Sequence, residues 1–274
     1  MRQKIIALCT TLSLITAAIA PAAAQAASYT IPVSTQAALD KTNAAADKTQ
    51  SARLSSLQGD LTALLKSEDQ WNERILSLHT QNEETLPSLR QQIQQIGLAE
   101  RSRLEQLVTQ TKAKYQPLFQ SYTTLNDRIQ AARALKSKEL NALLRIQADS
   151  MKAAVQLARA DIRAKEEALR TWKSKTAETV KKVRSTLKDM DPFKVQIRAE
   201  RSILSSLKKQ IPTASRNLTD AVKVTDAKRS IDALTSLTTI IRDINAHQQK
   251  IITYEQKISD ILSRAKSQIP AKQA

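Results

Sequence analysis

The sequence predicts an all-α protein, an elongated antiparallel helical bundle or coiled coil of long amphipathic helices. Glycine occurs only at Gly59 and Gly97 in 274 residues, whereas sheet proteins of this size need glycine at many turns. Aromatic residues make up 3% of the chain, too few for a thick globular core. Apolar residues recur at alternating spacings of three and four, which is typical of helices packed along narrow seams.

The first 26 residues have the pattern of a secretory signal peptide. Arg2 and Lys4 precede an apolar stretch at 5–19, and Pro21 with small residues leads to an Ala-Gln-Ala cleavage pattern at 24–26. The stretch is too short to predict a membrane span, and a retained anchor is the alternative. We therefore expect an exported protein, periplasmic, extracellular or cell-wall-associated, with no transmembrane span in the mature chain.

The first half of the mature chain is predicted to form one helical arm. Residues 27–35 are expected to be an irregular lead-in, and residues 36–116 a charge-balanced helical arm. The polar stretch 79–87 is the best loop candidate, because Pro87 disfavours helix at the residue before it. Gly97 costs helix stability by about 1 kcal/mol relative to Ala. The first seam consists of Leu54, Leu57, Leu61, Leu64, Trp71, Ile75 and Leu78, and it is interrupted by Glu68 and Asn82.

The second half predicts two further arms. No proline or glycine follows Pro117 until Pro192, so residues 117–190 predict one long basic helix. Asp191 and Pro192 form a helix-start signal, and residues 191–269 predict a basic helical arm with a break at Pro212, before a frayed tail at 270–274. Pro117 and Pro192 thus divide the mature chain into three arms of comparable length, which favours a three-stranded bundle. The cleanest seam is Leu234, Leu237, Ile241, Ile244, Gln248, Ile251, Ile258, Leu262 and Ala265.

Patterns of catalytic chemistry are missing from the sequence. With two glycines there is no phosphate-binding or dinucleotide loop and no nucleophile elbow. Cys9 is the only cysteine and precedes the expected cleavage point. The two histidines, His79 in the expected loop and His247 beside the last seam, are far apart and lack a partner at metal-binding spacing. We expect no enzymatic activity, no metal and no cofactor.

Charge is unevenly distributed along the mature chain. From residue 27 there are 41 basic and 26 acidic residues, a net charge of +15. Residues 27–116 hold ten of each sign, and residues 117–274 hold 31 basic and 16 acidic residues. One half is electrically balanced and the other is a polycation.

The basic residues of the long helix are aligned. Steps of four and three from residue 138 to residue 188 reach fifteen positions, of which ten are basic and only Asp149 and Glu166 are acidic. Most positions of this basic stripe lie one residue past the apolar seam of the same helix, and the stripe would extend for about 75 Å. Its alternative role is to cover the apolar edge with methylene stems or to pair with acidic residues of the neutral half. The stripe consists of Lys138, Arg145, Lys152, Arg159, Arg163, Arg170, Lys173, Lys181, Arg184 and Lys188.

These features favour a non-enzymatic binding or structural protein held by charge to an anionic polymer. Teichoic acid, lipopolysaccharide, acidic polysaccharide or extracellular DNA would suit the stripe, and the seams allow self-association. In outline, a basic, exported, tentacle-like helical chain is similar to the Skp chaperones, which implies a periplasmic holdase. Skp chaperones also have a small β-strand body, and this sequence has no strand-like block. An α-helical pore-forming toxin and a coiled-coil regulator of cell-wall hydrolases are the remaining alternatives.

Overall fold

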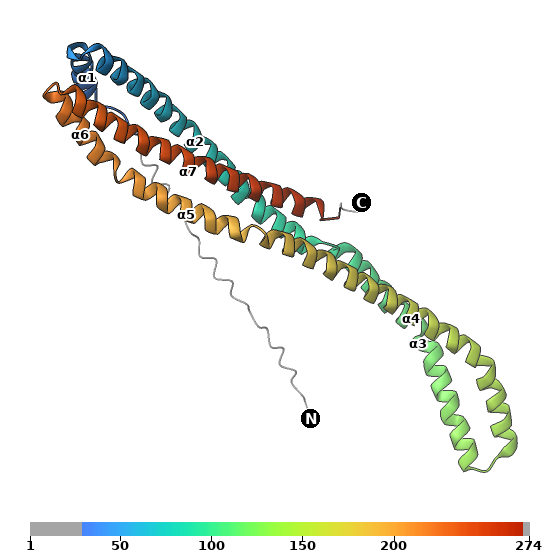
Figure 1. Cartoon of the computed structure of the whole chain (residues 1–274). Helices are drawn as coiled ribbons and strands as arrows, with labels where there is room; N and C mark the ends of the chain where they lie inside the picture. Colours follow the sequence, from blue (N-terminus) through green and yellow to red (C-terminus); the bar gives the residue numbers. More distant parts are fainter. Residues whose placement is uncertain (1–28, 271–274) are drawn as a thin grey trace.

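The structure is a computed structural model that describes residues 29–270, and within that range it is all-α with no strand (Figure 1). The predicted fold class is therefore confirmed. The expected signal peptide and the end of the tail lie outside the described residues. The helices are α1 (Val33–Ala45), α2 (Lys48–Gln95), α3 (Leu98–Ala134), α4 (Lys138–Lys188), α5 (Asp191–Lys208), α6 (Ile211–Lys223) and α7 (Ala227–Ser267).

The helices form a body and an arm. In the body, α7 packs against α2, α5 and α6, and α1 closes the end near α6. The arm is the hairpin of α3 and α4, which pack mainly on each other and extend beyond the end of α7 (Figure 1). The chain thus runs out along α2 and α3, returns along α4, α5 and α6, and turns back along α7 (Figure 1). Three helical segments lie side by side in the body and two in most of the arm.

The predicted seams form the core. In the body, α7 contributes side chains such as Leu234, Ile241 and Leu262 that are at most 2% exposed, because neighbours cover several faces of the helix. The arm has a much smaller buried cluster of Leu125, Ile129 and Ala148. No helix within residues 29–270 is long and apolar enough to cross a membrane.

The reversals differ from the predicted ones. Pro117 lies inside α3 and Pro87 lies inside α2. The predicted division of the chain at residue 117 and the predicted loop at 79–87 are therefore both wrong. Both prolines are exposed, and the carbonyl group that each leaves without its helical partner can bind water on that side. Pro192 lies at the start of a helix, as predicted, and the break predicted at Pro212 is the start of α6, but the chain continues along the same rod past both prolines (Figure 1).

The two reversals lie at 135–137 and at 224–226, and each contains a left-handed residue that is not glycine. Lys136 has φ 58° and Thr225 has φ 54°. At the first turn, the N–H of Ser137 donates to the carbonyl of Ala132, and the N–H of Lys136 donates to that of Arg133, both at 3.1 Å. This is the Schellman pattern that ends many helices. The single helix predicted over 117–190 is therefore two helices, α3 and α4.

Gly97 joins α2 to α3 without reversing the chain. Its φ is +70°, and a Cβ atom at this position would lie 2.3 Å from Cζ2 of Trp172 on α4. A side chain is thus excluded by both the backbone conformation and the indole ring. Gly97 sits at the junction between body and arm rather than in the middle of a helix.

The start of the described chain is more ordered than predicted. Helix α1 begins at Val33, inside the expected lead-in of 27–35. The hydroxyl groups of Tyr29 and Ser215 are 2.9 Å apart, which ties this end to α6. Asp47 then caps α2 by accepting hydrogen bonds from the N–H groups of Thr49 and Gln50.

Candidate polyanion-binding surface

The candidate surface is built on α4, which is one continuous helix from Lys138 to Lys188. Its apolar seam faces its neighbours, since Val155, Ala158 and Val183 are buried and Ile162, Leu169 and Trp172 are partly buried. The basic stripe follows this seam one residue later along the helix. At 51 residues, α4 carries the stripe over about 75 Å.

All ten residues of the stripe have exposed side chains. Among the described residues, only Lys173 of the ten forms an ion pair, with its Nζ 2.9 Å from Oε1 of Glu105 on α3. Arg101 pairs with the same carboxylate at 3.0 Å, and hydrogen bonds from Lys173 and Arg101 lower the pKa of Glu105. Internal pairing with the neutral half therefore accounts for one cation in ten.

Two acidic side chains near the stripe are themselves engaged. Glu166, one of two acidic residues at stripe positions, pairs with Lys112 of α3 at 2.6 Å. Asp161 accepts a hydrogen bond from the hydroxyl group of Tyr115 at 3.1 Å and lies 3.7 Å from Lys165. These carboxylates contribute to the contact between α3 and α4 rather than neutralising the stripe.

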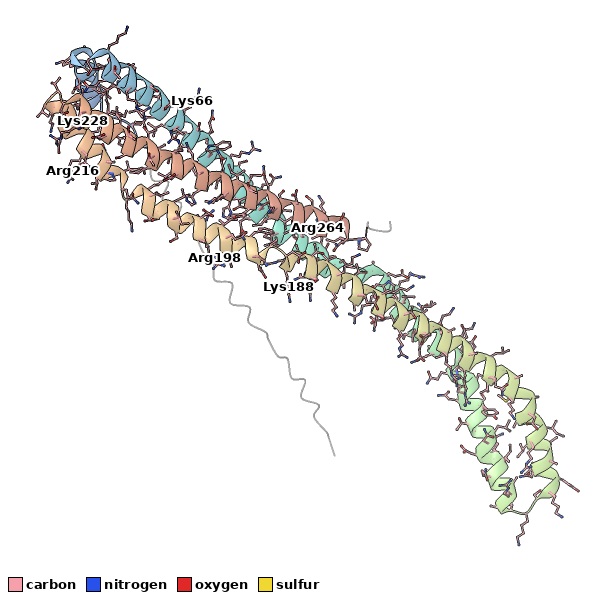
Figure 2. All side chains as sticks on the ribbon, in the orientation of Figure 1. Lys66, Lys188, Arg198, Arg216, Lys228 and Arg264 are labelled. Carbon is pink, nitrogen blue, oxygen red and sulfur yellow. The ribbon has the colours of Figure 1, made fainter. Side chains whose placement is uncertain are left out.

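Basic residues continue past α4 into the body. Figure 2 shows Lys188, Arg198 and Arg216 following one another along the rod of α4, α5 and α6. Among the basic residues there, Lys208 turns inward to Glu68 at 3.1 Å, and Lys223 pairs with Asp220 at 3.9 Å. Lys209, Arg216, Lys228 and Arg229 are exposed.

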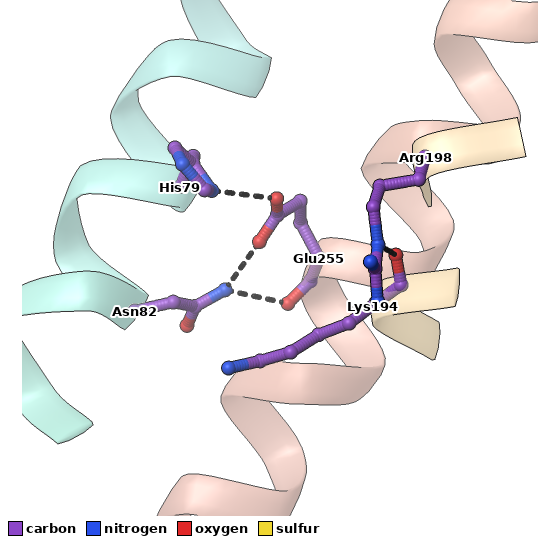
Figure 3. Close-up of polar contacts among 5 residues, drawn as sticks. All are labelled: His79, Asn82, Lys194, Arg198 and Glu255. Carbon is purple, nitrogen blue, oxygen red and sulfur yellow. Dashed lines mark hydrogen bonds and ion pairs between the residues drawn. The ribbon is translucent and has the colours of Figure 1, made fainter. Parts of the chain in front are cut away.

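The body has a second set of polar residues, which is buried. Glu255 of α7 is almost fully buried, with His79 Nδ1 2.9 Å from its Oε1, and it accepts a hydrogen bond from Asn82 at 2.9 Å (Figure 3). Burial favours a raised pKa, but the hydrogen bonds from His79 and Asn82 and the charges of His79 and Arg201 outweigh it and lower the pKa of Glu255. His79 is thus a helical residue that binds across the bundle, and the predicted loop position is wrong.

Two more polar contacts join α7 to its neighbours. His247 contacts Glu200 on α5 through Nδ1. The side-chain amide of Gln248 donates to Oδ1 of Asn72 at 2.7 Å, beside the buried Glu68. The sequence marked Glu68, Asn82 and Gln248 as polar seam positions, but their partners lie on other helices far away along the chain, and no sequence spacing identifies them.

These polar groups form packing contacts rather than a site with recognisable chemistry. Within residues 29–270 no group of three or more histidine, cysteine or acidic residues could hold a metal ion. The chain matches no protein family, and neither the curated proteins nor the solved structures include a significant match to it.

Proposed function

We propose that this chain is an exported, non-enzymatic protein that binds anionic polymers along α4. The observation that carries the proposal is the alignment of ten exposed basic side chains on one flank of a single continuous helix, nine of them without an ion pair in the described part of the chain. A linear array of positive charge attracts a linear polyanion, because each neutralised phosphate releases a condensed counterion.

The architecture supports this proposal. An arm that extends beyond the body leaves two helices with solvent on most sides, so a polymer can approach the stripe along its length (Figure 1). Two acidic residues near the stripe, Glu166 and Asp161, pair with side chains outside the stripe. Teichoic acid, lipopolysaccharide, acidic polysaccharide and extracellular DNA share the required anionic chemistry, and the sequence pattern of residues 1–26 is consistent with meeting them outside the cytoplasm.

The test is a salt titration with duplex DNA as the probe. Protein from Ala27 onward is compared with a variant in which five unpaired stripe residues are changed to Gln, namely Arg159, Arg163, Arg170, Lys181 and Arg184. We expect weaker binding and a log–log salt slope reduced in magnitude by up to about 4.5, since each phosphate contact contributes about 0.9.

The matched control removes the same charge from the body. It changes five exposed basic residues of α1 and α2 to Gln, namely Lys41, Lys48, Arg53, Lys66 and Arg90. Circular dichroism checks that both variants stay helical. Equal losses in the two variants would mean that only total charge matters, and the stripe would have no role as a binding surface.

A further inference from the structure

The far end of the arm exposes apolar side chains. Among the exposed large aliphatic residues of the described chain, five fall between residues 135 and 157, and their exposed fractions range from 45% to 77%. Single exposed aliphatic residues are common on soluble proteins, but a cluster of them indicates a surface that meets an apolar partner. The five are Leu135, Leu140, Leu143, Ile146 and Leu157.

Most of these residues share one flank of α4. Leu140, Leu143 and Ile146 follow one another at steps of three, which places them on one side of a helix, and Leu157 lies two heptads after Leu143. Leu143 and Leu157 directly precede the inward-facing positions 144 and 158. The basic stripe directly follows such positions, so the apolar residues and the stripe occupy opposite flanks of α4.

The end of the arm is also positively charged. Between residues 127 and 146 there are five basic residues and two acidic ones, Asp127 and Glu139. All five basic side chains are exposed, and none forms an ion pair within the described part of the chain. They are Arg128, Arg133, Lys136, Lys138 and Arg145.

We propose that the end of the arm binds the surface of an anionic phospholipid bilayer. The aliphatic flank enters the boundary between headgroups and acyl chains, while the basic residues of the α3–α4 turn contact lipid phosphates. Charge complementarity selects this partner over a second copy of the chain, because two arm ends would bring ten cations together. No described helix spans a membrane, so the arm lies in the interface.

The geometry of the arm explains why this flank is free. Helix α7 covers the body and reaches α4 only near the end of that helix, where Val180, Val183 and Leu187 belong to the same apolar cluster as Ile258 and Ile261. The end of the hairpin is left with one neighbour per helix, so a large part of each helix faces solvent. The turn at the outermost point of the hairpin (Figure 1) contains Leu135 beside Lys136, so an apolar and a charged side chain reach a surface together.

Vesicle co-sedimentation tests this inference. The probes are vesicles of phosphatidylcholine alone and of phosphatidylcholine with an equal amount of phosphatidylglycerol. The arm variant changes Leu135, Leu140, Leu143 and Ile146 to Ser, and the matched control changes Val33, Val195, Ile203 and Val224, four exposed aliphatic residues outside the arm, to Ser. We expect binding only to the anionic vesicles, a loss of at least about tenfold in the arm variant and no loss in the control.

The inference shares Lys138 and Arg145 with the proposed polymer-binding stripe, and the two are separated by measuring DNA binding on the same proteins. An arm variant that loses vesicle binding while keeping its salt slope for DNA supports both proposals. Failure of DNA binding alone removes the proposed function and leaves the lipid surface. The lipid proposal would be overturned if the protein did not bind anionic vesicles, or if the arm and control variants lost binding equally.

Discussion

The body and the arm are built from the same kind of amphipathic helix, yet they bury very different amounts of apolar surface. In the body, several neighbours surround α7, and residues such as Leu237 and Ile241 are fully buried. In the arm, each helix has one main neighbour, so Leu143 and Ile146 remain largely exposed. The comparison indicates that stability is concentrated in the body, whereas the arm uses length to present charge and apolar side chains to solvent.

Polar residues follow the same division. The body turns Glu68, Gln248 and Glu255 inward, where each has a partner on another helix. A shift in the register of α7 would leave these buried groups without partners, which costs about 1–3 kcal/mol for each group. The arm instead directs its charged side chains outward. Alignment of the helices is thus fixed in the body and extended into the arm.

The largest expected effect on the free energy of unfolding comes from substitutions that create a cavity, one in the body and one in the arm. Changing Ile241 to Ala removes a fully buried side chain at the centre of the body, and we expect a loss of about 2–5 kcal/mol in the free energy of unfolding. Changing Leu125 to Ala in the small arm cluster should cost less, because fewer neighbours surround that site. Urea unfolding followed by circular dichroism measures both. Equal losses would contradict a division between a stable body and a weaker arm.

The junction between the two regions gives the next largest effect. Changing Gly97 to Ala places a Cβ atom against Trp172 in a left-handed backbone, and we expect a loss of about 2 kcal/mol or more. Gly59 is the matched control, because it lies within α2 and a Cβ atom added there would have no neighbour within 4 Å. Ala at that position should raise the free energy of unfolding by about 1 kcal/mol. Changes of the same sign in both variants would remove the special role of Gly97.

The sequence predicted the helices and their seams well, because burial imposes a regular spacing on apolar residues. The seam of α7 from Leu234 to Ala265 is buried throughout, as predicted, and the ten stripe residues are exposed. The reversals were not predicted. They depend on Lys136 and Thr225 in left-handed conformations, where glycine is the usual signal, whereas Pro87 and Pro117 lie within helices.

The apolar flank of the arm was also missed, although its signal was present. Leu140, Leu143 and Ile146 recur at steps of three, but the sequence does not reveal that α7 ends before it could cover them. The partners of the buried polar residues could not be predicted for the same reason, because they depend on how the helices lie against one another. His79 and Glu255 are separated by 176 residues, and only the parallel register of α2 and α7 brings them together.

The smallest expected effect separates the two reversals. A left-handed backbone conformation costs a residue with a side chain roughly 1–2 kcal/mol, and glycine avoids this cost. Part of that gain in stability is offset, because glycine loses more conformational freedom on folding. Changing Thr225 to Gly at the end of the body should therefore raise the free energy of unfolding by about 0.5–1 kcal/mol. Changing Lys136 to Gly removes the same backbone strain at the end of the arm.

The second substitution should leave the global urea midpoint unchanged, because α3 and α4 can open at the turn while the body stays folded. Its effect should appear instead as slower amide hydrogen exchange around residues 132–141. Thr225→Gly should slow exchange throughout α6 and α7, since that turn belongs to the stable unit. If Lys136→Gly raises the global midpoint as much as Thr225→Gly does, the arm and the body unfold as one unit, and the division between them is one of shape and charge alone.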